Sequence, residues 1–518
     1  MIDEISIRKE YSNPDNAIRR GGMNGDLFWN RCACSFMYAP SFDFTPIPGC
    51  KNYLYVAEDV AGVKYEFTAD STYALLSPIW DNIASGQVQL MVYALNSEGK
   101  KIAMVGARSF HKSAPFTNKY PAAARDYRAS AKMAYEYLFT VPYVTDLAKK
   151  GAYNEEYALS IYVTKMLSAI ISAMIKYTQL NKEKAEYAMQ IAINAADFLI
   201  EHSAPKGTPL EGLPPTYYYD EDGDNYYYRK HPITSTRVKN TMLIYPAHAG
   251  SSDIELYQKT NNKKYLNAAL VIAEYYKTHV CENGTWYQIV SVKTGEPVSD
   301  DYCIPTVICR FLEKIFDITK EQEWKTLAKN GYDYIRKNCL KIFHWGGQFE
   351  DAVLSAQYSN LTHFEAIALI NDITKNSSDD EKEMAIAKEL MRYVEDQFVV
   401  WDNPPEYNKD GWDTSIWHYP CGLEQYYWYV PIDGSTATIF NAFINMHKVT
   451  QDELYLRKAR VLADSITRIQ NPKNGCIPTH WFEQDCMETG GDLWINCMIG
   501  TANYLFDFAD YLDKLAKD

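Results

Sequence analysis

Two adjacent carboxylates stand in a short stretch that also holds an indole, a histidine and a Gly-Gly pair. The stretch runs from His344 to Asp351 and reads His-Trp-Gly-Gly-Gln-Phe-Glu-Asp. Paired carboxyls beside aromatic rings suit acid and base chemistry on a sugar, so Glu350 and Asp351 are candidate catalytic residues. A helix cap is the alternative, because the free amides of a first helical turn favour acidic side chains. The apolar spacing of residues 352–372 predicts that a helix follows.

A second carboxylate is needed if this stretch acts on a glycosidic bond. One carboxylic acid protonates the leaving oxygen, and the other activates water or attacks the anomeric carbon. The candidates for the second role are Asp301, Glu424 and Asp433, which stand in or at the end of predicted loops. Helix capping is again the alternative for Asp301. No spacing in the sequence fixes the pair, because these residues belong to different predicted hairpins.

Aromatic residues are abundant and gather in the predicted loops. The chain has 42 tyrosines and 11 tryptophans. Rings with a polar edge stack on sugar faces and bond sugar hydroxyls. The candidate substrate-binding residues are Tyr226, Tyr227, Arg229, His248, Trp286, His344, Trp345, Gln348, Trp412, Trp417, His418, His480 and Trp481. The alternative is structural: such rings also pack cores, and His480 would then be a satisfied internal histidine.

The elements that must position these residues are helices from about residue 120 onward. A sequence pattern recurs in this region: an aromatic residue, then alanines, then an aromatic or aliphatic pair. It begins near residues 186, 264 and 323, and in a weaker form near residues 383 and 454. Such repeats predict stacked helical hairpins. Connections within each predicted pair are short, whereas those between pairs are long and rich in Tyr, Trp, Asp, Glu and His. We therefore expect the long, functional loops to share one face.

The region from about residue 120 onward has helical hairpins joined by loops rich in acidic and aromatic residues, and in this it resembles the six-hairpin glycosidase-like superfamily. That superfamily holds glycoside hydrolases, unsaturated-uronyl hydrolases, N-acylglucosamine 2-epimerase relatives and the toroid domains of several polysaccharide lyases. The resemblance implies a mainly α fold, with an (α/α)6 toroid of six helical hairpins at residues 119–518 as the catalytic domain. It also implies a catalytic funnel inside the ring.

Residues 1–118 have the pattern of β-strands instead. Runs of β-forming residues occupy 53–56, 63–68 and 88–94. They are separated by turn residues, and residues 96–99, Asn-Ser-Glu-Gly, are a candidate hairpin turn. Trp80 is a candidate core anchor. This spacing favours a small β-sandwich of the fibronectin-III or immunoglobulin kind, an accessory domain that needs to do no chemistry.

Charge and composition exclude other classes. The net charge of −14 argues against nucleic-acid and anionic-membrane partners. No apolar run suits a bilayer span and the start lacks a signal pattern, so we expect a cytoplasmic protein as the sequence stands, or a periplasmic or secreted one if a signal peptide was removed. No cofactor or metal is expected. The alternative is calcium at Asp220, Asp222 and Asp224, although His231 stands where an EF-hand has its last glutamate.

The preferred interpretation is a glycoside hydrolase acting on oligosaccharides or polysaccharides, including those with uronic acids. A polysaccharide lyase or sugar epimerase is the first alternative, since Tyr226, Arg229 and His248 offer a base and a group that neutralises a substrate carboxylate. The histidines available to an epimerase are His248, His344, His363, His418 and His480. A non-catalytic glycan-binding protein is the alternative from another class. The sequence fixes neither the sugar and linkage nor the oligomeric state.

Overall fold

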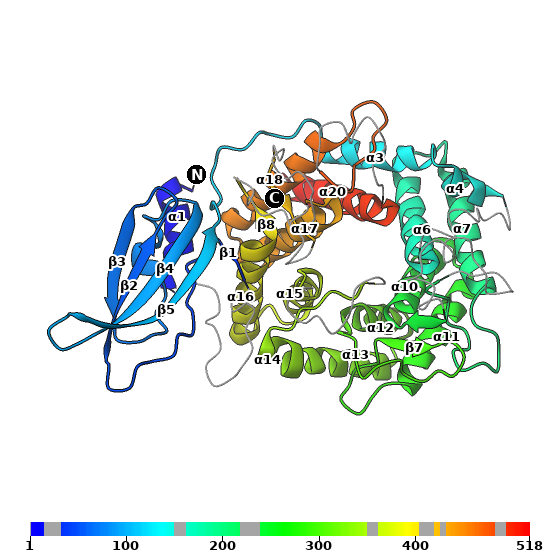
Figure 1. The fold of residues 1–518 in the computed structure, drawn as a ribbon. Coiled ribbons are helices and arrows are strands. Elements are labelled where there is room, and N and C mark those ends of the chain that lie inside the picture. The colour runs from blue at the N-terminus through cyan, green and yellow to red at the C-terminus, as the bar shows by residue number, and fades with distance from the viewer. Residues whose placement is uncertain are drawn as a thin grey trace.

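The computed structural model describes residues 2–14, 33–149, 162–217, 239–349, 361–402, 419–424, 431–481 and 494–517. These residues form an N-terminal region built on a β-sheet and a larger region of paired helices arranged around a ring (Figure 1). Most of the regular structure is therefore helical. Within the described ranges, no helix combines the length and the hydropathy that a bilayer span requires.

The N-terminal region holds one five-stranded sheet with the order β1-β5-β4-β2-β3. Its strands are β1 (Ser35–Phe36), β2 (Asn52–Glu58), β3 (Lys64–Ala69), β4 (Gly86–Leu95) and β5 (Lys101–Lys112). All neighbours are antiparallel except β1 and β5, which are parallel. The predicted strands and the hairpin turn at 96–99 are confirmed, since Gly99 N donates to Asn96 O at 3.0 Å. The β-sandwich is not confirmed, because the described strands form a single sheet.

One face of this sheet is buried, and Trp80 anchors the core beside it. The indole is 1% exposed, and its Nε1 donates to Met37 O at 3.0 Å. It belongs to the short helix α2 (Ser77–Trp80). The expectation of β structure throughout this region was wrong at α1 (Glu4–Ser12), where the side chain of Asp3 accepts from Ser6 N and caps the helix.

The helical region pairs each inner helix with an outer one. The inner helices are α6 (Val163–Leu180), α10 (Ile244–Thr260), α12 (Thr306–Thr319), α15 (Phe364–Asn376), α17 (Asp433–Thr450) and α20 (Ile495–Leu515). Their outer partners, in the same order, are α7 (Ala185–Glu201), α11 (Lys263–Thr278), α13 (Gln322–Tyr334), α16 (Glu381–Phe398), α18 (Glu453–Ile469) and α3 (Tyr127–Leu138). The first described long helix of the region, α3, thus packs against the last.

Contacts between the inner helices close a cycle. Helix α6 contacts α10, the series continues through α12, α15 and α17 to α20, and α20 contacts α6 again. The connections from inner to outer helix are short, for example at 261–262 and 451–452. The inner helices are entered through the long connections, so their N-termini lie on the long-loop face of the ring.

One predicted helix boundary was wrong. Helix α15 begins at Phe364 rather than near 352, because Leu361 pairs with Gly346 and Thr362 N donates to Trp345 O at 2.9 Å in an extended segment. Helix α3, the first described long helix of the helical region, ends at Leu138, and the short helix α4 (Pro142–Thr145) follows it. Proline disfavours a helical conformation in the residue before it, and Val141 is extended.

A buried polar cluster joins the two regions. Tyr11 and Tyr38 of the N-terminal region each donate through Oη to the Glu395 carboxylate at 2.8 Å. Lys458 of α18 donates to the same carboxylate at 2.8 Å and is fully buried. On the next residue, the Asp396 carboxylate accepts the backbone N–H of Met37 and Tyr38. The N-terminal region is therefore held against the ring through specific hydrogen bonds.

Candidate active site

One stripe of each inner helix stays partly exposed. On α6 it comprises Lys165, Ala169, Ser172 and Lys176, and on α17 it comprises Gly434, Thr438, Asn441 and Asn445. Positions three and four apart share one helix face. The outer partner and two inner neighbours cover the other sides of each helix, so the stripe faces the centre of the ring. Because its residues are mostly polar or small, the ring interior is a polar space rather than an apolar core.

Polar pairs between neighbouring helices cross the deeper part of this interior. They are Lys176 to Asp507 at 2.7 Å, Lys314 to Glu255 at 2.9 Å and Asn445 to Asn371 at 2.8 Å. These residues lie beyond the midpoints of their helices, toward the short connections. Among the described residues, these three pairs therefore lie away from the helix N-termini and the long-loop face.

A small sheet at the ring mouth brings several predicted site residues together. This rim sheet comprises residues 399–400, 421–424, 431–433 and 479–481. Strand β8 (Val399–Val400) pairs with β9 (Cys421–Gly422), and bridges link Leu423 to Pro431 and Ile432 to His480. The rim sheet therefore positions Glu424, Asp433, His480 and Trp481, four residues that the sequence analysis proposed from two predicted loops.

Gly422 allows the rim sheet to approach α17 closely. A Cβ at this position would lie 2.8 Å from Thr436 N, a contact that side chains do not adopt. Gly422 N also donates to Thr436 Oγ1 at 2.8 Å. This contact fixes β9 against the first turn of α17, where Asp433 stands.

Asp433 is a fully buried carboxyl at the start of α17. Its Oδ2 accepts from Thr501 Oγ1 of α20 at 3.1 Å, and its Oδ1 has no hydrogen-bond partner among the described residues. Burial raises the pKa of Asp433 well above its usual range, and the charge of Glu424 raises it further. A carboxyl with a raised pKa beside a second carboxyl is an arrangement that glycosidic acid catalysis uses.

Glu365 in the first turn of α15 is a second buried carboxyl near the mouth, and the sequence analysis did not select it. Its Oε2 accepts from Thr306 Oγ1 of α12, and its Oε1 accepts from Gln348 Nε2 at 2.8 Å. Burial raises the pKa of Glu365, although Thr306, Gln348 and Arg310 act in the opposite direction. The signal in the sequence that could have pointed to Glu365 is an acidic residue in the first turn of a predicted helix that follows a long loop.

Gln348 positions Glu365 rather than facing open space. It is 9% exposed, and its amide also bonds the backbone of Ile304 in both directions, at 3.1 and 3.0 Å. Asp301 lies near His344, since its charge raises the pKa of that histidine against the dominant lowering effect of burial. Ser299 Oγ donates to Asp301 Oδ2 at 2.8 Å. Asp301, His344 and Gln348 thus gather around the starts of α12 and α15.

His248 occupies the stripe of α10 that faces the ring interior and stacks near Tyr245, with ring centroids 5.9 Å apart. Burial lowers its pKa to about 3, and the charges of Arg310, Lys165 and Lys314 lower it too. His248 is therefore a neutral imidazole at working pH, and the cations around it come from α6 and α12.

Three predicted binding residues belong to the core instead. Trp286 and Trp345 are both 0% exposed, and Trp286 Nε1 donates to Tyr276 O at 2.8 Å, so neither indole can stack on a sugar. His363, proposed for an epimerase, is also fully buried, with its ring centroid 4.1 Å from that of Phe364. Aromatic side chains that pack around the start of a helix and those that line a binding surface have the same pattern in the sequence. The sequence analysis therefore did not distinguish the two.

Several predicted residues lie outside the described residues. They are Glu350, Asp351, Tyr226, Tyr227, Arg229, Trp412, Trp417 and His418, together with the alternative calcium ligands Asp220, Asp222 and Asp224. In the part of the chain that the structure does describe, no group of His, Cys, Asp or Glu side chains is arranged to hold a metal ion.

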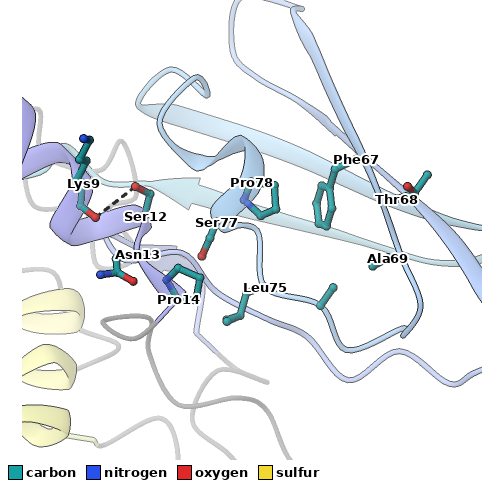
Figure 2. A pocket seen from close by; sticks show the side chains of 11 residues that line it. Lys9, Ser12, Asn13, Pro14, Phe67, Thr68, Ala69, Leu75, Ser77 and Pro78 are labelled. Carbon is teal, nitrogen blue, oxygen red and sulfur yellow. Dashed lines mark hydrogen bonds between the residues drawn. The ribbon is translucent and has the colours of Figure 1, made fainter.

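A second hollow, of about 690 Å³, lies on the N-terminal region, between α1, α2 and the edge strand β3 (Figure 2). Lys9, Ser12, Phe67 and Pro78 are among its lining residues. The described lining contains no carboxylate and no histidine. The described lining of this hollow therefore offers no pair of groups for acid and base chemistry.

Comparisons with known proteins support the fold. No family model and no curated protein matches the chain. Among solved structures, a D-mannose isomerase is similar at 13% identity and a TM-score of 0.52, covering 74% of this chain and 97% of that chain. The cellobiose 2-epimerase from Spirochaeta thermophila has 13% identity and a TM-score of 0.52 over 74% of this chain and 98% of its own. A family 76 glycoside hydrolase from a bovine Bacteroides thetaiotaomicron strain has 8% identity and a TM-score of 0.49 over 89% and 93%. At such identities the first two likenesses concern the fold alone.

Proposed function

We propose that this protein is a carbohydrate-processing enzyme that hydrolyses glycosidic bonds. In this proposal the ring of inner and outer helices is an (α/α)6 toroid and forms the catalytic domain. The N-terminal region, up to about residue 118, is its accessory domain. The long-loop mouth of the ring receives an oligosaccharide or polysaccharide.

The observation that carries the proposal is the pairing of Asp433 with Glu424 on the rim sheet. In this proposal Asp433, whose pKa is raised, gives a proton to the leaving oxygen from its Oδ1, which has no hydrogen-bond partner among the described residues. Because the Asp433 side chain is 0% exposed, this step requires the rim sheet to open toward the substrate. Glu424, on the adjacent strand, serves as the base or nucleophile. Glu365 on α15 is a third carboxyl of the same mouth. Glu350 and Asp351 stay predictions for these roles.

A sugar epimerase or isomerase is the second candidate, and His248 favours it. The imidazole faces the ring interior and is unprotonated, as a base must be. Its pKa of about 3 makes it a weak proton acceptor, and we rank this function second for that reason.

Product analysis of a neutral and acidic oligosaccharide panel tests the proposal. Hydrolysis creates a new reducing end, elimination creates an unsaturated sugar that absorbs in the ultraviolet, and epimerisation keeps chain length. We expect new reducing ends, lost in Asp433→Asn and Glu424→Gln. If those variants keep full activity while Glu350→Gln or Asp351→Asn lose it, the acid pair has been misassigned. Epimerised products of unchanged length would replace hydrolysis with the second candidate.

A further inference from the structure

Arg310 is a cation inside the ring that makes no hydrogen bond or ion pair among the described residues. It lies in the second turn of α12, four residues after Thr306, so the two side chains project from the same helix face. Thr306 reaches Glu365 across the ring mouth. Arg310 is exposed, whereas its neighbours Cys309 and Phe311 are fully buried. Exposure on an inner helix places the guanidinium in the ring interior.

The charge of Arg310 reaches three other inner helices. It acts on His248 of α10, Glu365 of α15 and Tyr504 of α20. In the cycle of contacts, α12 and α20 stand on opposite sides. Arg310 thus acts on groups of both neighbouring inner helices, α10 and α15, and of the opposite one, α20. We infer that its side chain extends toward the centre of the ring, about one helical turn below the mouth.

Two deeper cations of the interior, Lys314 and Lys176, differ from Arg310 because each has a carboxylate partner. Lys314, four residues further along α12, bonds Glu255 at 2.9 Å, and Lys176 bonds Asp507 at 2.7 Å. These pairs join neighbouring helices and need no ligand. A guanidinium in the same interior without a paired carboxylate is suited to an anion that arrives with the substrate.

The nearest acids do not cancel this charge. Burial favours the protonated form of Glu365, which has no charge to pair with Arg310. Its carboxyl oxygens also accept hydrogen bonds from Thr306 and Gln348. The chain as a whole carries a net charge of −14 and repels anions at long range. A local cation is therefore needed for an acidic sugar to enter the ring.

We propose that Arg310 binds an anionic group of the sugar substrate, a carboxylate or a phosphate ester, inside the ring. The proposal rests on the sugar-processing function above and names its substrate class. The guanidinium fork receives the two anion oxygens. The rest of the sugar then extends toward the carboxyls at the mouth, and sugars without a negative charge bind more weakly.

Calorimetric binding with the full chain tests this proposal. The probes are D-glucuronate and D-galacturonate, with glucose 6-phosphate as the phosphate arm and D-glucose and D-galactose as neutral counterparts. Wild-type protein is compared with Arg310→Gln, Arg310→Lys and the matched charge control Arg8→Gln, which changes an exposed arginine of α1. We expect the acidic form of at least one sugar to bind about tenfold or more tightly than its neutral form, with Arg310→Gln abolishing the difference.

Arg310→Lys should keep part of that preference, because it keeps the charge but loses the fork. Arg8→Gln should keep all of it. The carboxylate and phosphate arms distinguish the two anion sources. Equal binding of neutral and acidic sugars, a preference that survives in Arg310→Gln, or no Arg310-dependent binding of any probe would overturn the proposal. Because binding is measured without turnover, an anion preference without cleavage would leave this inference standing and reject hydrolysis.

Discussion

At the scale of the residue, the proposed hydrolysis depends on a carboxyl with a raised pKa. Asp433 has one because it is buried, stands near Glu424 and, among the described residues, receives one side-chain hydrogen bond, from Thr501. Water would stabilise its charged form, and its site at the start of α17 excludes water. In the proposed mechanism, this environment would give two carboxyls of nearly equal intrinsic acidity different roles.

Replacing Asp433 by Asn should abolish most activity without unfolding the protein. The amide has the same shape and can still accept from Thr501, but it cannot give a proton. We expect a loss of about 10²–10⁴ in kcat, the range of general acid catalysis. At about pH 4, where aspartate is partly protonated even in the unfolded chain, the free energy of unfolding should stay within about 1 kcal/mol of wild type. Asp253→Asn is the matched control, since Asp253 is 4% exposed with a raised pKa but lies outside the rim sheet, and it should keep its activity.

The same residue predicts a pH dependence of stability. The folded pKa of Asp433 is raised above its unfolded value near 3.8, so the native state holds the proton more tightly than the unfolded chain. Stability contributed by this proton is present below the unfolded pKa and declines as pH rises toward the folded pKa. Urea unfolding at a series of pH values should therefore show Asp433→Asn gaining on wild type as pH rises above about 4. A constant difference across that range would mean that Asp433 titrates normally.

At the scale of the element, close helix packing holds the proposed catalytic side chains at one mouth of the ring. Gly250 of α10 lies against the ring of Phe311 of α12, and a Cβ there would stand 2.6 Å from Phe311 Cζ. Gly500 of α20 has no atom within 4 Å of such a Cβ. Both glycines therefore lie in inner helices, but of the two only Gly250 is packed closely against a neighbouring side chain.

Gly250→Ala should destabilise the protein, and Gly500→Ala should not. In both helices alanine gains up to about 1 kcal/mol over glycine from backbone propensity. At Gly250 this gain is outweighed by overpacking against Phe311, which typically costs about 1–3 kcal/mol. Chemical denaturation of both variants measures the difference. Equal stabilisation of the two would show that α10 and α12 can separate without penalty.

The elements were more predictable from sequence than the site. Helical periodicity and the short connections marked the paired helices because burial of one stripe per helix leaves a strong pattern. Trp286 and Trp345 were misassigned, since a tryptophan at a loop looks the same in sequence whether it lines a cleft or fills a core. Arg310 was missed because an arginine within a helix reads as a solvent-facing residue. Only the closed cycle of helices shows that solvent-facing can mean the inside of a ring.

At the scale of the whole molecule, the N-terminal region and the ring share a charged, buried contact. Lys458 lies between Glu395, at 2.8 Å, and Glu10, at 3.5 Å. Burial lowers the pKa of Lys458, but the two carboxylates outweigh it and the pKa is raised overall. Long-range contacts of this kind, between residues hundreds of positions apart, leave no local pattern in the sequence.

Lys458→Met should therefore loosen the N-terminal region from the ring. Removing the cation leaves Glu395 and Glu10 buried without their counter-charge, and breaking such a buried pair costs about 3–5 kcal/mol. The control is Lys64→Met, whose ion pair with Glu58 has side chains 56% and 37% exposed and should contribute about 0–1 kcal/mol. Urea unfolding measures the two losses, and limited proteolysis of the connection at 113–126 reports separation of the regions. If both variants lose the same small amount, the methionine packs into the site and the N-terminal region is held by its apolar contacts instead.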